Sequence, residues 1–117
     1  MINQTDPKKR GKASRNKGAK AERELANILK ERGYPVNRGK VFYKESDVVG
    51  LDGIHIECKR VERLNIHEAM KQAVNEAQKR SDGKPAVFFR RDREEWLVTM
   101  RLSDWLEVYG EWQKRVL

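Results

Sequence analysis

Apolar and polar positions recur with a helical period in three stretches of the chain. In residues 19–32 the apolar side chains fall at helical spacing, and Gly33 follows where a helix C-terminal glycine is expected. A second run starts after Asn65, which has a glutamate three residues later as in a capping box, and ends near residues 81–83. The third run follows Ser103, a potential N-cap, and its apolar stripe consists of Trp105, Val108, Tyr109 and Trp112.

Short segments rich in β-branched and aromatic residues predict five strands. They are residues 34–38, the two segments on either side of Asp52-Gly53, residues 85–90 and residues 96–100. The order is then helix, strand, strand, strand, helix, strand, strand, helix. This order predicts an α/β or α+β fold, with a mixed sheet flanked by helices.

The hairpin around Asp52-Gly53 carries charged residues where a core strand should be apolar. Its second strand places Ile54, Ile56 and Cys58 on one face and His55, Glu57 and Lys59 on the other. Cys58 is therefore expected in the core. Such a break in the hydrophobic pattern is expected at a functional site.

The register of this hairpin decides which acids meet. A two-residue turn would place Asp47 opposite Cys58, on the wrong face. A three-residue loop, residues 51–53 with Gly53 in the left-handed conformation, would place Asp47 opposite Glu57. We predict the three-residue loop.

Charge is distributed unevenly over the 117 residues. The formal net charge is +8 and the pI is about 9.8, which favours a polyanionic partner. Residues 1–20 contain seven basic residues and one acid, so they carry +6 of this charge. We expect residues 1–15 to form a flexible basic arm, helical order to begin near residues 16–18, and residues 16–117 to form a single domain. The arm either binds phosphates or only aids solubility.

Several classes of protein are disfavoured. A single cysteine, Cys58, allows no internal disulfide, which favours a reducing compartment. No apolar run is long enough for a signal peptide or a membrane span. We therefore expect a cytoplasmic protein with no membrane partner.

Three acids and one lysine form the candidate catalytic set. Glu22 lies on the same helical stripe as the core residues of the first helix, which is unusual for a carboxylate. The alternative interpretation is more common: an acid in the first helical turn only interacts favourably with the helix dipole. Asp47 and Glu57 would form a hard oxygen site suited to Mg²⁺, with Lys59 beside them to stabilise developing charge, and the implied reaction is phosphodiester hydrolysis. Alone, a Glu-x-Lys strand is usually a solvated surface with a weak ion pair.

Four segments together resemble the archaeal-type Holliday junction resolvases and their phage relatives, which belong to the PD-(D/E)xK, or restriction-endonuclease-like, nuclease superfamily. The segments are residues 17–25 (KGAKAEREL), 33–38 (GYPVNR), 46–50 (SDVVG) and 56–59 (IECK). Ser46 stands where the superfamily name expects a proline. The resemblance implies a restriction-endonuclease-like core.

The resemblance also implies roles for individual residues. The matched catalytic positions are Glu22, Asp47, Glu57 and Lys59. Asp47 and Glu57, with the backbone carbonyl of Cys58 as a further ligand, would hold Mg²⁺ or Mn²⁺, and no organic cofactor is expected. Glu22 would act through a metal-bound water or as a ligand of a second ion. Arg23 matches a basic residue that contacts DNA, and the other residues expected to contact DNA are Lys17, Lys20, Arg15 and Arg38. Independently of the resemblance, His55 is a candidate supporting residue because it shares the strand face of Glu57. Gln72 either supports the site, as in related nucleases, or lies on a solvated helix face, which is the more common case.

The sequence thus predicts a metal-dependent, structure-selective DNA endonuclease that resolves four-way junctions as a homodimer, in recombination or repair. One alternative is a non-catalytic DNA-binding or recombination accessory protein. Another is a nuclease that acts on flapped, nicked or ordinary duplex DNA. The stripe of Trp105, Tyr109 and Trp112 is expected in the core or in a dimer interface rather than as a base-stacking platform.

Overall fold

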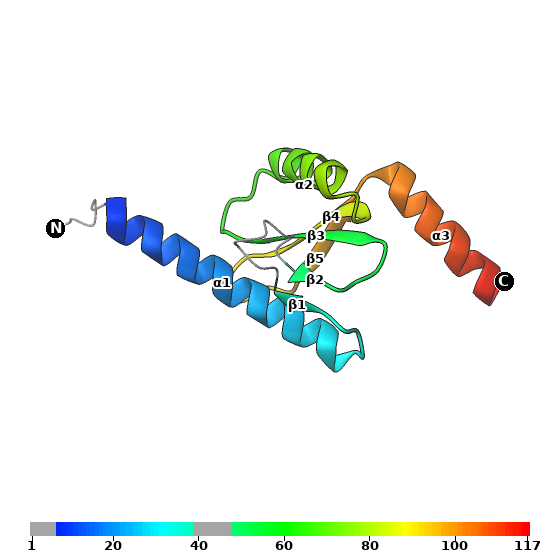
Figure 1. Cartoon of the computed structure of the whole chain (residues 1–117), viewed down its shortest axis with the longest axis horizontal. Coiled ribbons are helices and arrows are strands. Elements are labelled where there is room, and N and C mark those ends of the chain that lie inside the picture. Colours follow the sequence, from blue (N-terminus) through cyan, green and yellow to red (C-terminus); the bar gives the residue numbers. More distant parts are fainter. Residues whose placement is uncertain (1–6, 39–47) are drawn as a thin grey trace.

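The computed structural model describes residues 7–38 and 48–117, with side chains from residue 16 onward. Its elements follow the predicted order (Figure 1). They are α1 (Pro7–Glu31), β1 (Asn37–Arg38), β2 (Val48–Val49), β3 (Ile54–Arg60), α2 (Ile66–Arg80), β4 (Lys84–Arg90), β5 (Leu97–Met100) and α3 (Leu102–Val116).

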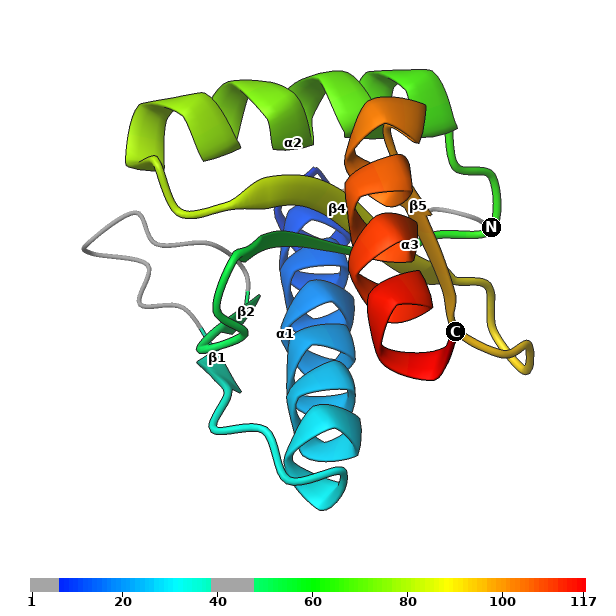
Figure 2. The same ribbon diagram turned by 90° about the vertical axis from the view of Figure 1, so that its right-hand side faces the viewer.

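The strands form one mixed sheet in the order β1-β2-β3-β4-β5. Among the described strands only β3 and β4 are parallel neighbours, and α2 provides the crossover between them. Helices α1 and α2 cover opposite faces of the sheet, whereas α3 projects away from it (Figures 1 and 2). The predicted fold class is confirmed.

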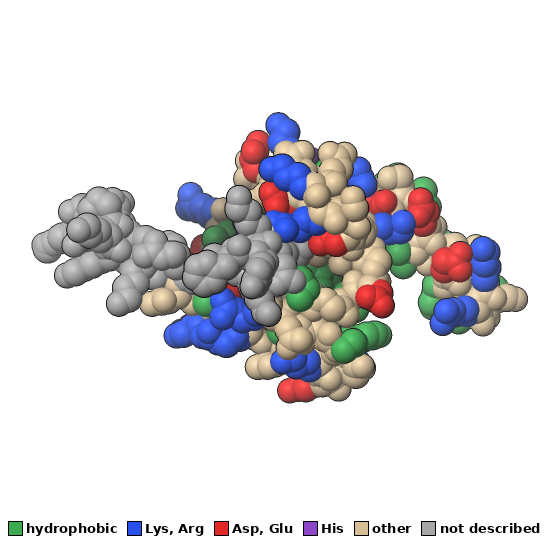
Figure 3. Space-filling view, in the orientation of Figure 1, with side chains coloured by type: hydrophobic (Ala, Val, Ile, Leu, Met, Phe, Trp, Pro, Cys, Tyr) green, Lys and Arg blue, Asp and Glu red, His purple; other side chains and the backbone are tan. Residues whose placement is uncertain are grey.

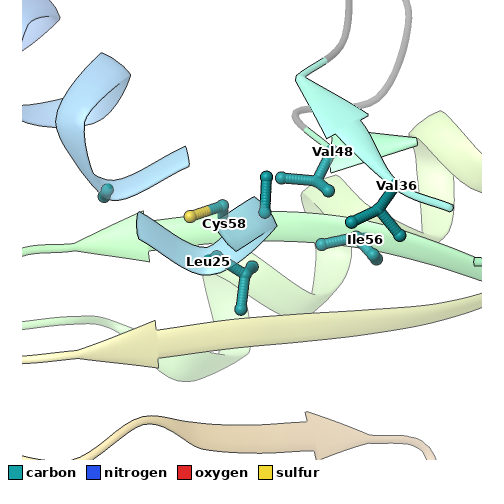
Figure 4. Packing of buried hydrophobic residues seen from close by; sticks show 7 residues of the cluster. Leu25, Val36, Val48, Ile56 and Cys58 are labelled. Carbon is teal, nitrogen blue, oxygen red and sulfur yellow. The ribbon is translucent and has the colours of Figure 1, made fainter. Parts of the chain in front are cut away.

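The core lies mainly between α1 and the hairpin side of the sheet. Leu25 and its neighbours on α1 pack against Val36, Val48, Ile56 and Cys58 (Figure 4). Cys58 is buried there, as its strand face predicted. On the other sheet face, alanines of α2 pack against Val87. These two layers fix the rotation of β3, and hence the direction of its charged side chains.

The hairpin has the register of the predicted three-residue loop. β2 pairs with β3 through Val48 and Ile56. The Ile54 N–H donates to the Leu51 carbonyl at 3.1 Å, and Gly53 has a φ of +85°. A left-handed glycine at this place is what such a loop requires. The prediction of the longer turn is therefore confirmed.

The helix ends agree with the sequence signals in two of three cases. Gly33, at φ +94°, follows the end of α1, and the Asn65 side chain accepts the Glu68 N–H at 3.1 Å to cap α2. The predicted cap at Ser103 is wrong. α3 already begins at Leu102, directly after β5, and Arg101 binds the Asp104 carboxylate at 2.9 Å instead.

Helix α1 begins at Pro7, well before the predicted start near residues 16–18. Proline suits the first helical position, and the following lysines, arginines and alanines favour helix. This part of α1 extends beyond the sheet (Figure 1), so it needs no apolar stripe and leaves no hydrophobic period to detect. The expectation of no fixed structure in residues 7–15 is corrected. None of the helices in the described part is both long and apolar enough to span a bilayer.

A polar cluster ties α1 to the far side of the sheet. The Glu24 carboxylate accepts from Arg90 Nε and Nη2 at 2.7 and 2.9 Å, and from Trp96 Nε1 at 2.8 Å. The hydrogen bonds from Arg90 lower the pKa of Glu24, whereas partial burial acts to raise it. The hydrogen bond from Trp96 and the charge of Arg60 lower the pKa further, and the net shift is downward. Glu24 thus joins the first helix to the last two strands.

Replacing Glu24 with glutamine should lower the free energy of unfolding by about 1 kcal/mol at neutral pH. This is less than the loss of a buried charged hydrogen bond would cost, because the Glu24 side chain is partly exposed to solvent. The pKa of Glu24 is lower in the folded state than in the unfolded state. Its contribution to stability is therefore fully present at pH values above the unfolded pKa and disappears as the pH falls through the folded pKa. Urea unfolding of wild type and variant at pH 7 and pH 3 measures this. The control is Glu94→Gln, because Glu94 forms an exposed ion pair with Arg91. An equal difference at both pH values would contradict the assignment.

Candidate active site

Strand β3 directs Glu57 and Lys59 toward α2. Glu57 lies beside Val87 in the parallel ladder, and Val87 packs under α2, so Glu57 and Lys59 share the α2 face. Glu57 is 4% exposed. Its Oε2 lies 3.6 Å from Lys59 Nζ, which holds a cation next to a nearly buried carboxylate.

Within the described residues, β2 pairs with β3 only at Ile56, so the strand from Glu57 onward has no described partner on that edge. Helices α1 and α2 flank β3 from opposite faces of the sheet (Figure 2). Polar residues of all three elements can therefore reach one space.

That space is a cleft of about 470 Å³. Glu22 lines it from α1, Glu57 and Lys59 line it from β3, and Gln72 lines it from α2. Three of the four side chains predicted to be catalytic are thus brought to one cleft. The fourth, Asp47, lies outside the described residues, and the roles of all four stay predictions.

Glu22 is held by an arginine from the neighbouring strand. Arg38 donates from Nε at 3.2 Å and from Nη2 at 3.0 Å to Glu22 Oε1. The Glu22 side chain is 21% exposed, less than an ordinary surface acid. Arg38, predicted to contact DNA, therefore also fixes a candidate catalytic acid at the mouth of the cleft.

His55 is buried on the same strand face, two residues before Glu57. Its Nδ1 lies 2.9 and 3.0 Å from the two Asp82 oxygens, and its Nε2 lies 3.6 Å from Glu57 Oε1. Burial alone lowers the pKa of His55, but the hydrogen bonds and charges of Glu57 and Asp82 outweigh it and raise the pKa above its ordinary value. The predicted supporting residue thus touches a candidate catalytic acid.

The other predicted residues have different surroundings. Lys17 lines the cleft and lies 3.6 Å from Asp92, while Lys20 and Arg23 are exposed on α1. Cys58 lines the cleft although its thiol packs in the core. The side chain of Arg15 lies outside the described part.

The donor set fits a hard divalent cation. Glu22 and Glu57 supply carboxylate oxygens to one cleft, and oxygen is the donor that Mg²⁺ and Mn²⁺ accept. Among the described residues no three His, Cys, Asp or Glu side chains form a metal-binding group by themselves. Asp47, the other acid predicted to bind the cation, lies outside the described residues.

The sequence did not indicate the contact of His55 with Asp82. Asp82 follows α2 in a Ser-Asp-Gly segment, which looks only like a helix end. The parallel register pairs Ile54 with Lys84, so the end of α2 meets the start of β3. Only this pairing of distant segments brings the two residues together, and no local signal could have shown it.

Comparisons with known proteins found a matching family and a similar solved structure. Residues 13–117 match the model of a family described as "Phage putative PDDEXK endonuclease". Hjc, a Holliday junction resolvase from the archaeal hyperthermophile Archaeoglobus fulgidus, has a similar solved structure, with a TM-score of 0.54 and 24% sequence identity over 72% of each chain. At this identity the likeness shows the fold alone. A search of curated proteins found no match.

The family match covers the three elements that line the cleft, β3 and α2 in full and α1 from residue 13 onward. The predicted membership of the PD-(D/E)xK superfamily is confirmed, and nucleases of this superfamily generally use divalent metal ions. The chain belongs to the family of phage PDDEXK endonucleases.

Proposed function

We propose that this protein is a metal-dependent endonuclease that nicks branched DNA, with four-way junctions as its principal substrate. The observation that carries the proposal is the cleft that gathers Glu22, Glu57 and Lys59 from two separate elements. A DNA-binding module has no need for acids facing phosphates. The fold shared with a Holliday junction resolvase supports the choice of substrate.

Asp47 is proposed as the remaining acid. It directly precedes Val48, whose partner in the ladder is Ile56, and Glu57 directly follows Ile56. In an antiparallel pair, continuing this register by one residue would set Asp47 opposite Glu57, on the same face. The register of β2 and β3 therefore supports the two acids acting together.

Separate groups of the chain are proposed to bind the cation, to stabilise developing charge and to contact the substrate. Glu22, Asp47, Glu57 and the Cys58 carbonyl would hold the cation, with Mg²⁺ as the proposed ion and Mn²⁺ as its substitute. When bound, the ion supplies Lewis acidity and neutralises phosphate charge. Lys59 stabilises negative charge developing on the phosphate, and Gln72 lies where it can donate a hydrogen bond to substrate.

Basic side chains around the cleft are proposed to bind the DNA backbone. Lys and Arg side chains lie along α1 and over α2 on the face shown in Figure 3. The residues assigned to this role are Arg23, Lys17, Lys20, Arg15 and Arg38. Their contacts to phosphates would position the duplex arms over the cleft without reading sequence.

Deleting residues 1–15 should weaken DNA binding and reduce its salt dependence while leaving cleavage chemistry intact. The deletion removes five basic residues and lets α1 begin at Asn16, a good helix cap. Each lost phosphate contact flattens the slope of log K against log salt by about 0.9, so a decrease of up to about four is expected. Fluorescence anisotropy over a salt series measures this slope. An unchanged slope would show that the segment only aids solubility.

A second copy of the chain is proposed to pack on α3. The predicted stripe is not in the core of the described chain, because Trp105, Tyr109 and Trp112 are 46%, 38% and 54% exposed. The Trp105 and Tyr109 rings are stacked with centroids 5.2 Å apart, and the Trp112 ring is tilted against Tyr109 at 5.6 Å. An apolar stripe of this size on a projecting helix favours an interface between proteins. Two copies would supply one cleft for each of the two strands to be nicked.

The substrate is tested by incubating labelled four-way junction, flapped, nicked and linear duplex DNA with the protein and Mg²⁺. Paired nicks on the junction support the proposal. Cleavage of the other DNAs but not of the junction would keep the chemistry and change the substrate. Binding without cleavage, with Mg²⁺ or Mn²⁺, would leave only an accessory role.

A further inference from the structure

His55 joins the candidate catalytic face to the far end of α2. Its side chain is fully buried on β3, between the carboxylates of Asp82 and Glu57. A carboxylate only accepts hydrogen bonds, so Asp82, at 2.9 Å from Nδ1, requires the proton on that nitrogen. This fixes the plane of the ring and directs Nε2 toward Glu57.

The two oxygens of Glu57 have different neighbours. Oε1 lies 3.6 Å from His55 Nε2, and Oε2 lies 3.6 Å from Lys59 Nζ. His55 and Lys59 are the residues two before and two after Glu57, so the alternation of β3 places one on each side of it. The Glu57 carboxylate therefore has the buried histidine ring beside one oxygen and the lysine ammonium beside the other.

Asp82 is itself held by a rigid junction. Ser81 closes α2 in the left-handed conformation, and Lys84 N donates to the Gly53 carbonyl at 2.8 Å. A Cβ on Gly83 would lie 2.4 Å from the Gly53 backbone, so the two loops pack main chain to main chain. The end of α2 cannot shift relative to β3 without breaking these contacts.

We infer that His55 is a positioning residue that, anchored by Asp82, orients the Glu57 carboxylate for cation binding. The inference rests on the proposed function, because it assumes that Glu57 binds a cation. Residues that orient a metal ligand in this way typically account for about 10- to 100-fold in metal affinity. His55 acts through Glu57 and does not itself contact substrate.

The test is the affinity of the protein for Mn²⁺ without DNA, measured by electron paramagnetic resonance of the free ion. We expect His55→Gln to raise the dissociation constant by about 10- to 100-fold. Asp82→Asn should change it in the same direction by a smaller factor. The matched control is His67→Gln, the other histidine, which is exposed on α2 and should leave the affinity unchanged.

Cleavage provides a second readout that separates positioning from general damage. In His55→Gln the Mn²⁺ concentration for half-maximal cleavage should rise by the same factor, while the rate at saturating Mn²⁺ returns close to wild type. Wild-type Mn²⁺ affinity in a folded His55→Gln protein would overturn the inference. If that variant does not fold, wild-type affinity in Asp82→Asn overturns it instead. A wild-type protein that neither binds Mn²⁺ nor cleaves DNA would instead refute the proposed function.

Discussion

Replacing Glu57 with glutamine is expected to reduce DNA cleavage by more than about 100-fold, because even residues that only support a metal ligand account for about 10- to 100-fold. The change keeps the shape of the side chain and removes its charge. Glu57 is nearly buried and close to Lys59, so solvent has little access to compensate for the loss of the carboxylate charge. Single-turnover cleavage of a labelled junction at saturating protein measures the effect.

Glu62→Gln is the matched control for this variant. Glu62 lines the same cleft but is exposed, and its Oε2 lies 3.3 Å from the Asp92 backbone N–H. Its replacement removes the same charge from the same cleft, and we expect less than a few-fold change in rate. Equal losses in both variants would mean that cleft charge, and not the position of Glu57, governs cleavage.

Replacing Trp112 with glutamate should convert a dimer into a monomer, with a dissociation constant raised by at least about 100-fold. A tryptophan in the centre of an interface commonly contributes 2 kcal/mol or more, and the new carboxylate would be buried without a partner. Trp112 is 54% exposed in the single chain and stacks beside Tyr109, so the change should leave the monomer folded. Sedimentation equilibrium measures the constant.

Ser103→Glu is the control for the dimer. Ser103 is exposed on the side of α3 away from the aromatic stripe, so it receives the same charge outside the proposed interface. It should remain dimeric, and its nicks should stay paired, whereas the nicks of Trp112→Glu should become uncoupled. A wild type that is monomeric at the concentrations that cleave DNA would refute this interface.

The hairpin and the order of elements could be predicted from the sequence because local chemistry decides them. The Asp52-Gly53 loop, the cap at Asn65 and the glycine at residue 33 each act within a few residues. The alternation of β3 then placed Glu57 and Lys59 on one face. The cleft that gathers Glu22 with them follows from two helices covering opposite faces of the sheet.

Three features could not be predicted, each for a physical reason. The first turns of α1 lie beyond the sheet and leave no hydrophobic period. The aromatic stripe on α3 has the same helical spacing whether it packs in the core of the chain or against a second chain. The sequence pattern therefore does not distinguish a core from an interface. Asp82 meets His55 only through the parallel pairing of β3 with β4.

The most direct test of the proposed metal-dependent centre is the cleavage of a labelled four-way junction by wild type and by Asp47→Asn, with Mg²⁺ and with EDTA. We predict paired nicks by wild type with Mg²⁺ alone, no detectable nicks by Asp47→Asn, and equal junction affinity for the two proteins. Cleavage by Asp47→Asn at the wild-type rate, or undiminished wild-type cleavage in EDTA, would contradict the proposed centre.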